Sequence, residues 1–92
     1  MKVRIFGKES CSVCKSMLEK FNTFLKHWKI EDKVKLIYKS VDDVDGLTEA
    51  ALADATEVPA IIIEKNGQEL ARWTGRGVES KEFKPYFEDM II

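Results

Sequence analysis

The chain has 92 residues, 45% of them hydrophobic, which is enough apolar material for one core but not for two. We therefore expect residues 1–92 to form a single domain. The 15 basic and 16 acidic residues leave a formal net charge of −1, so no overall field draws the chain to nucleic acid or to an anionic membrane. No segment has the pattern of a signal peptide or the length of a membrane span. We expect a cytoplasmic protein that works as a monomer.

The N-terminal half of the sequence predicts a strand, a helix and a second strand. Residues 2–6 alternate apolar and charged side chains, as in a half-buried strand, and Gly7 ends this pattern. A helix of about 17 residues is expected from Val13, because the apolar residues that follow recur every three or four positions. These residues are Met17, Leu18, Phe21, Phe24, Leu25 and Trp28. Residues 33–41 alternate again and predict the second strand.

The middle of the chain is acidic and then rich in alanine. Residues 42–46 contain three aspartates and a glycine, which predicts a turn. The alanine-rich segment 47–55 favours a short helix, with Thr48 or Asp45 as its N-cap.

The last third of the sequence predicts a hairpin and a final helix. The unbroken apolar run 60–63 is typical of a strand covered on both faces, and Asn66-Gly67 predicts a tight turn into a strand over residues 69–73. Pro85 interrupts the helical spacing of the last apolar residues, so we expect this helix to be kinked or to start late. Those residues are Phe83, Phe87, Met90 and Ile91. The resulting order, β-α-β-α-β-β-α, joins a parallel βαβ unit to a hairpin and predicts an α/β fold with helices covering the sheet.

Cys11 and Cys14 are the only cysteines, and they lie where the first strand gives way to the long helix. The thiolate is the form that attacks a disulfide, so a reactive cysteine needs a lowered pKa. The free N–H groups and positive dipole end of a helix N-terminus stabilise such an anion, and Cys11 lies in the first turn if Ser10 is the N-cap. Cys14 follows one helical turn later, close enough to form a disulfide with Cys11. It shares the apolar helix face, so it is expected to be the more buried of the two thiols. We therefore assign Cys11 as the nucleophile and Cys14 as the resolving thiol.

Three other uses of the cysteine pair remain open. A structural zinc site needs four ligands, and the chain offers only His27 besides the two cysteines. An iron–sulfur cluster shared by two chains would need ligands from a partner or a small thiol. The cysteines could also be inert packing residues. We expect His27 itself to be a surface residue near the end of the long helix.

The chain resembles the thioredoxin–glutaredoxin superfamily over essentially its whole length. The resemblance depends on Cys11-Ser12-Val13-Cys14 at the strand-to-helix junction, on Val58-Pro59 before an apolar strand, and on a hairpin followed by Trp73-Thr74-Gly75. It implies a thioredoxin fold, in which a four-stranded mixed sheet is flanked by three helices. It also implies a dithiol–disulfide oxidoreductase that uses the Cys-x-x-Cys pair.

The same resemblance implies roles for the residues around the dithiol. Pro59 would have a cis peptide bond and face the dithiol, and the backbone of Val58 would bind an extended peptide or glutathione. Gly75 would let the substrate approach closely, because it has no side chain. Ser12 and Val13 lie between the cysteines and would contact a bound substrate.

The chain also departs from the family patterns. Ser10, Ser12 and Val13 replace the tryptophan and the central pair of thioredoxins, and the first strand lacks their buried aspartate, so the proton acceptor for Cys14 is unassigned. The usual glutathione pattern is incomplete. We expect Arg76 or Lys8 to be the residue that would hold a substrate carboxylate.

The leading hypothesis is that the chain reduces disulfides of proteins or small thiols. No metal or organic cofactor is needed, and the electron donor is either glutathione or a flavin-dependent thioredoxin reductase. We expect a reducing potential in the range of thioredoxins and glutaredoxins. Two alternatives are an iron–sulfur carrier that binds through Cys11 and a docking domain that binds protein segments near Pro59 without turnover.

Overall fold

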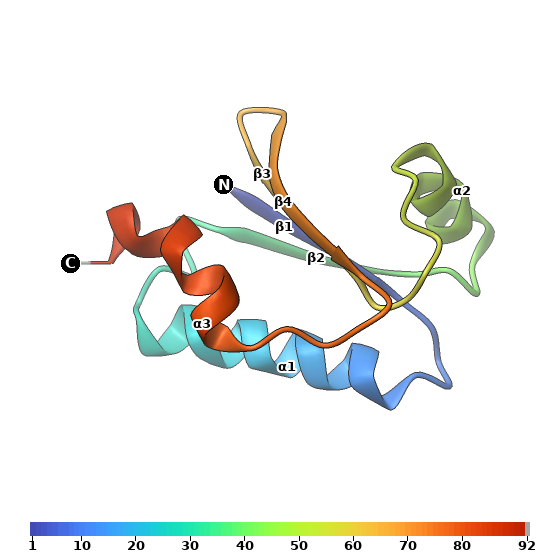
Figure 1. Cartoon of the computed structure of the whole chain (residues 1–92), viewed down its shortest axis with the longest axis horizontal. Helices are drawn as coiled ribbons and strands as arrows, with labels where there is room; N and C mark the ends of the chain where they lie inside the picture. Colours follow the sequence, from blue (N-terminus) through green and yellow to red (C-terminus); the bar gives the residue numbers. More distant parts are fainter. Residues whose placement is uncertain (92) are drawn as a thin grey trace.

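The computed structural model describes residues 1–91. Within this range it contains a four-stranded sheet, three α-helices and a 3-10 helix, η1 (Figure 1). In chain order the elements are β1 (Lys2–Gly7), α1 (Ser12–His27), β2 (Lys35–Ser40), α2 (Val44–Leu52), β3 (Ala60–Lys65), β4 (Gln68–Thr74), α3 (Ser80–Phe83) and η1 (Lys84–Met90). The predicted element order and α/β class are confirmed. None of the helices in the described range has the length and apolar composition needed to cross a membrane.

The sheet has the strand order β2-β1-β3-β4. β1 runs parallel to β2 and antiparallel to β3, and β3 and β4 form the predicted hairpin. Asn66 and Gly67 at its turn have φ angles of 53° and 79°, the left-handed pair that a two-residue hairpin turn favours. Ala60 at the start of β3 pairs with Phe6 on one side and with Thr74 on the other. The end of β1, the start of β3 and the end of β4 therefore meet at one end of the sheet.

α1 and α3 cover one face of the sheet, and α2 lies on the opposite face (Figure 1). Aromatic rings connect α1 to α3 in the larger core. Phe21 stacks on Phe83 with ring centroids 4.1 Å apart, and Phe24 meets Phe83 edge-on at 4.8 Å. The buried residues of this core are Val3, Ile5, Met17, Phe21, Phe24, Leu25, Ile30, Val34, Ile61, Ile63, Val78, Phe83 and Phe87. The apolar stripe predicted for the long helix thus forms the main core.

The opposite face of the sheet is covered by α2 through small side chains. A Cβ at Gly46 would collide with the carbonyl oxygen of Ser40, so only glycine allows the helix to come this close to the end of β2. The buried residues of this second core are Phe6, Ala50, Ala55, Ala60 and Ile62.

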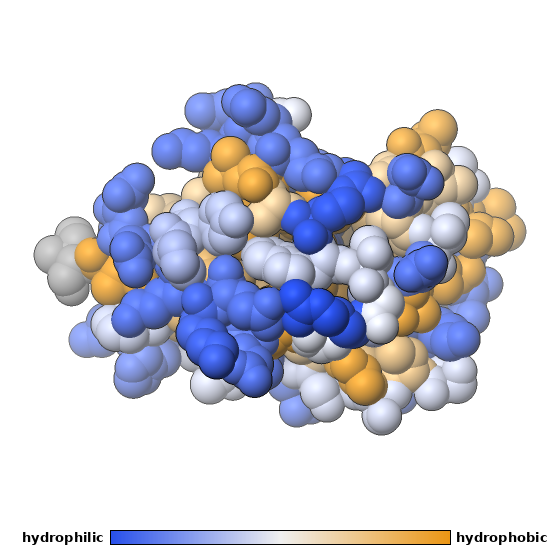
Figure 2. Space-filling model, in the orientation of Figure 1, coloured by the Kyte–Doolittle hydropathy of each residue, from blue (hydrophilic) through white to orange (hydrophobic). Residues whose placement is uncertain are grey.

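The outer surface of α2 carries apolar side chains. Val44, Leu47 and Leu52 are 81%, 50% and 84% exposed. Figure 2 shows hydrophobic side chains over α2, at the end of the molecule where β1 passes into α1 in Figure 1. Single exposed apolar residues are common, whereas a group of them is typical of a contact surface.

Ion pairs occupy the part of this sheet face that α2 leaves uncovered. Arg4 pairs with Glu64 at 2.8 Å, and its guanidinium lies 5.5 Å from the centre of the Phe6 ring. Arg72 pairs with Glu69 at 2.6 Å. The long side chains of these pairs cover apolar strand surface while their charged ends stay near water.

The start of α2 differs from the prediction. The helix begins at Val44 with Asp43 at the N-cap position, so Asp45 and Thr48 lie inside the helix instead of capping it. The Thr48 hydroxyl donates to the Val44 carbonyl at 2.8 Å. The earlier start follows from β2, because the Asp43 N–H donates to the Ser40 carbonyl and closes a turn directly after the strand. The expected acidic turn over residues 42–46 is correspondingly shorter.

The last helix breaks near Pro85, as the sequence predicts. α3 ends at Phe83, and the chain continues as η1 with Pro85 in its first turn. Proline lacks the N–H that an α-helix would need at this point, so the tighter 3-10 geometry takes over. Phe83 and Phe87 are both fully buried on either side of the break.

Replacing Phe83 with alanine should remove the ring that connects α3 to α1. Loss of a fully buried phenylalanine typically lowers the free energy of unfolding by about 3–5 kcal/mol. Urea unfolding followed by circular dichroism measures this loss. Tyr86→Ala, in the same segment but partly exposed, should cost much less. Equal losses in the two variants would contradict the packing described for Phe83.

Glu82 should remain ionised to unusually low pH. Arg76 donates to its two oxygens at 2.7 and 3.1 Å, and the Glu79 N–H donates to it at 3.0 Å, which together lower the pKa of Glu82 from 4.5 to about 2. Because the folded-state pKa is the lower one, the stabilisation is present above pH 4.5 and is lost as the pH falls toward 2. An NMR titration of the carboxyl carbon tests this. In Arg76→Gln the pKa should rise toward its ordinary value, and an unchanged pKa would show that Arg76 is not the cause.

Candidate active site

The cysteine pair lies between the end of β1 and the start of α1. β1 ends at Gly7, a short loop follows, and α1 begins at Ser12. Cys11 and Cys14 are joined by a disulfide, with their Cα atoms 5.3 Å apart. This separation is ordinary for a disulfide, so the backbone at the start of α1 holds the two side chains at bonding distance.

The N-cap of α1 is Cys11, so the prediction that Ser10 caps the helix is wrong. The Cys11 sulfur accepts a hydrogen bond from the backbone N–H of Cys14 at 3.1 Å, which is the contact an N-cap side chain makes. The Cys11 N–H in turn donates to the Lys8 carbonyl at 3.1 Å and closes the preceding loop. Because of this loop, the N-cap lies one residue later than predicted, at Cys11 instead of Ser10. The sulfur of Cys11 therefore lies directly at the positive end of the helix.

The two sulfurs differ in their access to solvent. The Cys14 side chain is completely buried, as predicted, whereas Cys11 is half-buried. Between them, Ser12 is exposed and Val13 is 45% exposed. A substrate can therefore reach Cys11 from solvent, while Cys14 can reach only Cys11.

The segment before β3 lies at the same end of the sheet. The Val58–Pro59 peptide bond is cis, which confirms the expectation from the family resemblance. Pro59 precedes Ala60, the residue that pairs with the end of β1. The N–H of Gly75 donates to the Pro59 carbonyl at 3.0 Å, and Gly75 has a φ of 76°, which glycine adopts without strain.

The loop after β4 packs against the first turns of α1. The Val78 N–H donates to the sulfur of Met17 at 3.3 Å. A Cβ at Gly77 would lie 3.4 Å from Val13 and 3.6 Å from the Met17 sulfur, so the backbone passes close to the residues beside the disulfide. The structure thereby brings together three segments that are distant in sequence. They are the loop over residues 8–11 (the Cys loop), the Val58-Pro59 segment before β3, and the loop that begins at Gly75.

The two basic residues proposed to hold a substrate carboxylate differ in their surroundings. Arg76 is exposed, and both of its terminal nitrogens contact Glu82. Its guanidinium also donates to the Gly77 carbonyl. Lys8 is exposed in the loop before Cys11. Their roles in binding a substrate stay predictions.

A contact between Gly7, Tyr38 and Cys14 was not apparent from the sequence. A Cβ at Gly7 would collide with the hydroxyl oxygen of Tyr38 and would lie 2.7 Å from the Cβ of Cys14. The pKa of Tyr38 is raised, mainly by burial and then by the negative charges of Glu9 and Asp42. The Glu9 N–H donates to the Asp42 carboxylate at 2.9 Å and holds the two loops together. The sequence alone marked Gly7 only as the end of a strand.

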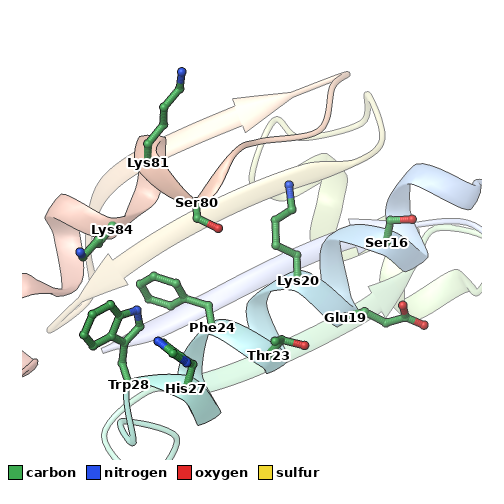
Figure 3. Close-up of a pocket in the computed structure, with 10 residues that line it drawn as sticks. All are labelled: Ser16, Glu19, Lys20, Thr23, Phe24, His27, Trp28, Ser80, Lys81 and Lys84. Atoms are coloured by element: carbon green, nitrogen blue, oxygen red, sulfur yellow. The ribbon is translucent and has the colours of Figure 1, made fainter.

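A separate groove of about 800 Å³ lies between α1 and the α3–η1 segment (Figure 3). The amine of Lys84 lies 4.6 Å from the centre of the Trp28 ring, and His27 meets that ring edge-on at 4.9 Å. The Lys20 amine donates to the Val78 carbonyl at 3.0 Å. The aromatic and cationic groups of this groove therefore already contact protein groups, and the disulfide is not part of its wall.

Residues 1–91 contain no cluster of side chains suited to bind a metal ion. Among residues 1–91, no group of three or more His, Cys, Asp or Glu side chains could hold a metal ion. His27 is exposed in the last turn of α1, as expected, and packs against Trp28. A zinc or iron–sulfur site at the cysteine pair would therefore need ligands from outside the described residues.

Comparison with solved structures supports the expected fold. The chain superposes on thioredoxin 1 from Thermosipho africanus with a TM-score of 0.75 and 26% identity, over 98% of both chains. It matches thioredoxin O2 from Arabidopsis thaliana in the oxidized state with a TM-score of 0.77 and 16% identity, over 99% of this chain and 75% of the other. For Fasciola hepatica thioredoxin the TM-score is 0.74 with 22% identity, over 96% and 78% of the two chains. No family model matches the sequence, and no curated protein matches it.

These similarities agree with the geometry of the site. The mixed four-stranded sheet with three helices is the thioredoxin fold that the sequence resemblance implied. The neighbours and the cysteine pair support a thiol–disulfide oxidoreductase role at the level of the family. The fold and the Cys11–Cys14 pair at the start of α1 together place this chain in the thioredoxin-like superfamily.

Proposed function

We propose that this protein reduces disulfide bonds of other proteins in the cytoplasm through Cys11 and Cys14. The observation that carries the proposal is the disulfide at the start of α1, with one accessible sulfur at the helix N-terminus and one buried sulfur behind it. A helix N-terminus favours the thiolate that attacks a disulfide. The buried sulfur is sheltered from other reactants, so its partner is Cys11.

The reaction proceeds by two exchanges in the reduced protein. The Cys11 thiolate attacks one sulfur of the substrate disulfide, and the other substrate sulfur leaves as a thiolate and takes up a proton. Cys14 then loses its proton and attacks the Cys11 sulfur, which releases the second substrate thiol. The substrate disulfide gains two electrons, and the two cysteines lose two electrons and form the disulfide seen in the structure.

Two features favour a protein as the substrate. Exposed Val13 lies beside the disulfide, and the apolar outer surface of α2 lies at the same end of the molecule (Figure 2). Such surfaces suit the apolar side chains of a polypeptide. Arg76, one of the two residues proposed to hold a substrate carboxylate, is already paired with Glu82. In this proposal the backbone of Val58 and the open space at Gly75 accept an extended segment of the substrate.

After each turnover the protein needs a reductant that converts the Cys11–Cys14 disulfide back to two thiols. Either glutathione or a flavin-dependent thioredoxin reductase would supply the two electrons and two protons. The protein would need no bound metal or organic cofactor of its own, because sulfur exchange requires only the two thiols.

Cys11→Ser should abolish turnover, because the remaining thiol, Cys14, is fully buried and cannot reach a substrate disulfide. Cys14→Ser should still attack the substrate but stop at that stage, and mass spectrometry should detect a covalent complex through Cys11. His27→Ala, altered at the exposed far end of α1, serves as the control and should keep normal activity. Reduction of insulin disulfides is measured with thioredoxin reductase in one assay and with glutathione and its reductase in another. Inactivity of the unmodified protein in both assays would contradict the proposed function.

The dithiol should be reducing. A potential between about −270 and −200 mV, the range of thioredoxins and glutaredoxins, is expected because Ser12-Val13 lacks the features of a strong oxidase. Equilibration with glutathione buffers of known ratio, followed by trapping of the free thiols, measures the potential. A value above about −160 mV would place the protein with oxidases and overturn this expectation.

A further inference from the structure

We propose that Tyr38 is a positioning residue for the resolving step: its hydroxyl donates a hydrogen bond to the Cys14 sulfur once the Cys11–Cys14 disulfide is reduced. The role of this hydrogen bond in turnover rests on the proposed function. It concerns a contact between β1, β2 and α1 that lies behind the disulfide. This contact addresses how the buried Cys14 thiol can ionise although the adjacent strand β1, Lys2–Gly7, carries no aspartate or glutamate.

The geometry at Gly7 brings the two groups together. A side chain at this position would meet the Tyr38 hydroxyl oxygen and the Cys14 Cβ at once, with the Cζ of Tyr38 at 2.9 Å and the Cys14 Cβ at 2.7 Å. The hydroxyl and the Cys14 side chain are therefore neighbours across the space that glycine leaves empty. Sγ is bonded to this Cβ, so the sulfur is one bond away from an atom that lies beside the hydroxyl.

The position of Tyr38 is fixed by the sheet. Tyr38 pairs with Ile5 in the parallel register of β1 and β2, and its side chain packs against the main core. The Val41 N–H donates to the Gly7 carbonyl at 2.7 Å, which continues the contact between the two strands to the level of the disulfide. The register and this packing therefore place the Tyr38 side chain on the face of the sheet that α1 covers.

The surroundings of Tyr38 make it a hydrogen-bond donor. Burial first, and then the charges of Glu9 on the Cys loop and Asp42 on the loop after β2, raise the pKa of Tyr38 above its ordinary value. The hydroxyl thus keeps its proton at neutral pH and acts as a donor to a neighbouring anion. Burial disfavours a thiolate at Cys14, and a donated hydrogen bond favours it.

The resolving step, in which Cys14 attacks the mixed disulfide at Cys11, needs no reactant other than water. In the mixed disulfide, the Cys14 thiol passes its proton to water, and the resulting thiolate accepts the hydrogen bond from Tyr38. The thiolate attacks the Cys11 sulfur, a bond forms between the two protein sulfurs, and the bond from Cys11 to the substrate breaks. The departing substrate thiolate takes a proton from water, and Tyr38 keeps its own proton throughout.

The test begins with Cys11→Ser, in which Cys14 is the single thiol. The pKa of that thiol is measured by NMR of cysteine labelled with ¹³C at Cβ, with and without Tyr38→Phe. Loss of one hydrogen bond to a charged group should raise the pKa by about one unit, a tenfold loss of thiolate at a given pH. Tyr86→Phe is the matched control, because Tyr86 lies on η1 and packs against Trp73. A shift in Tyr38→Phe no larger than in this control would overturn the inference.

A second measurement follows the resolving step in the protein with both cysteines. Cys11 is first converted to a mixed disulfide with thionitrobenzoate, and stopped-flow absorbance records its release by Cys14 at different pH values. Tyr38→Phe should move the inflection of the rate to higher pH by the same amount, and an unmoved inflection contradicts the role. The thiol titration does not require turnover, so a protein that fails to reduce insulin but shows the pKa shift would refute the proposed function alone.

Discussion

The hydrogen bond from the Cys14 N–H to the Cys11 sulfur is the contact on which the rest of the site depends. It makes a cysteine the N-cap of α1, so the sulfur itself occupies the position where a helix best stabilises negative charge. The Lys8 carbonyl holds the loop that leads to this position, and the main core holds the helix behind it. The reactive sulfur is therefore placed by the backbone, and its chemistry follows from where α1 begins.

Close backbone approaches build the rest of the site. Gly7 leaves space for Tyr38 beside Cys14, and at Gly77 the loop after β4 passes next to Val13. Gly75 has a left-handed φ angle, and its N–H donates a hydrogen bond to the Pro59 carbonyl. Each contact joins segments that are far apart in sequence. At Gly7 a larger side chain would collide with both Tyr38 and Cys14, so the site depends on glycine at this position.

The sequence predicted those parts of the structure that local patterns determine. The apolar stripe of α1, the Asn66-Gly67 turn and the strand from Ala60 were all visible in it, and the family resemblance added the cis bond at Pro59. It missed features set by long-range contacts. The earlier start of α2 depends on the Ser40 carbonyl at the end of β2, and the place of Tyr38 depends on the register between two strands. Cys11 was missed as the cap because serine is the more usual cap residue.

The most direct test of the central claim is a thiol titration of the fully reduced protein, with each cysteine observed separately by NMR. The account predicts that Cys11 ionises below the pKa of a free cysteine, because the Cys14 N–H and the start of α1 favour its anion. It also predicts that Cys14 ionises at a higher pH than Cys11. If Cys11 ionises at or above the pKa of a free cysteine, the helix N-terminus does not activate it and the account is contradicted.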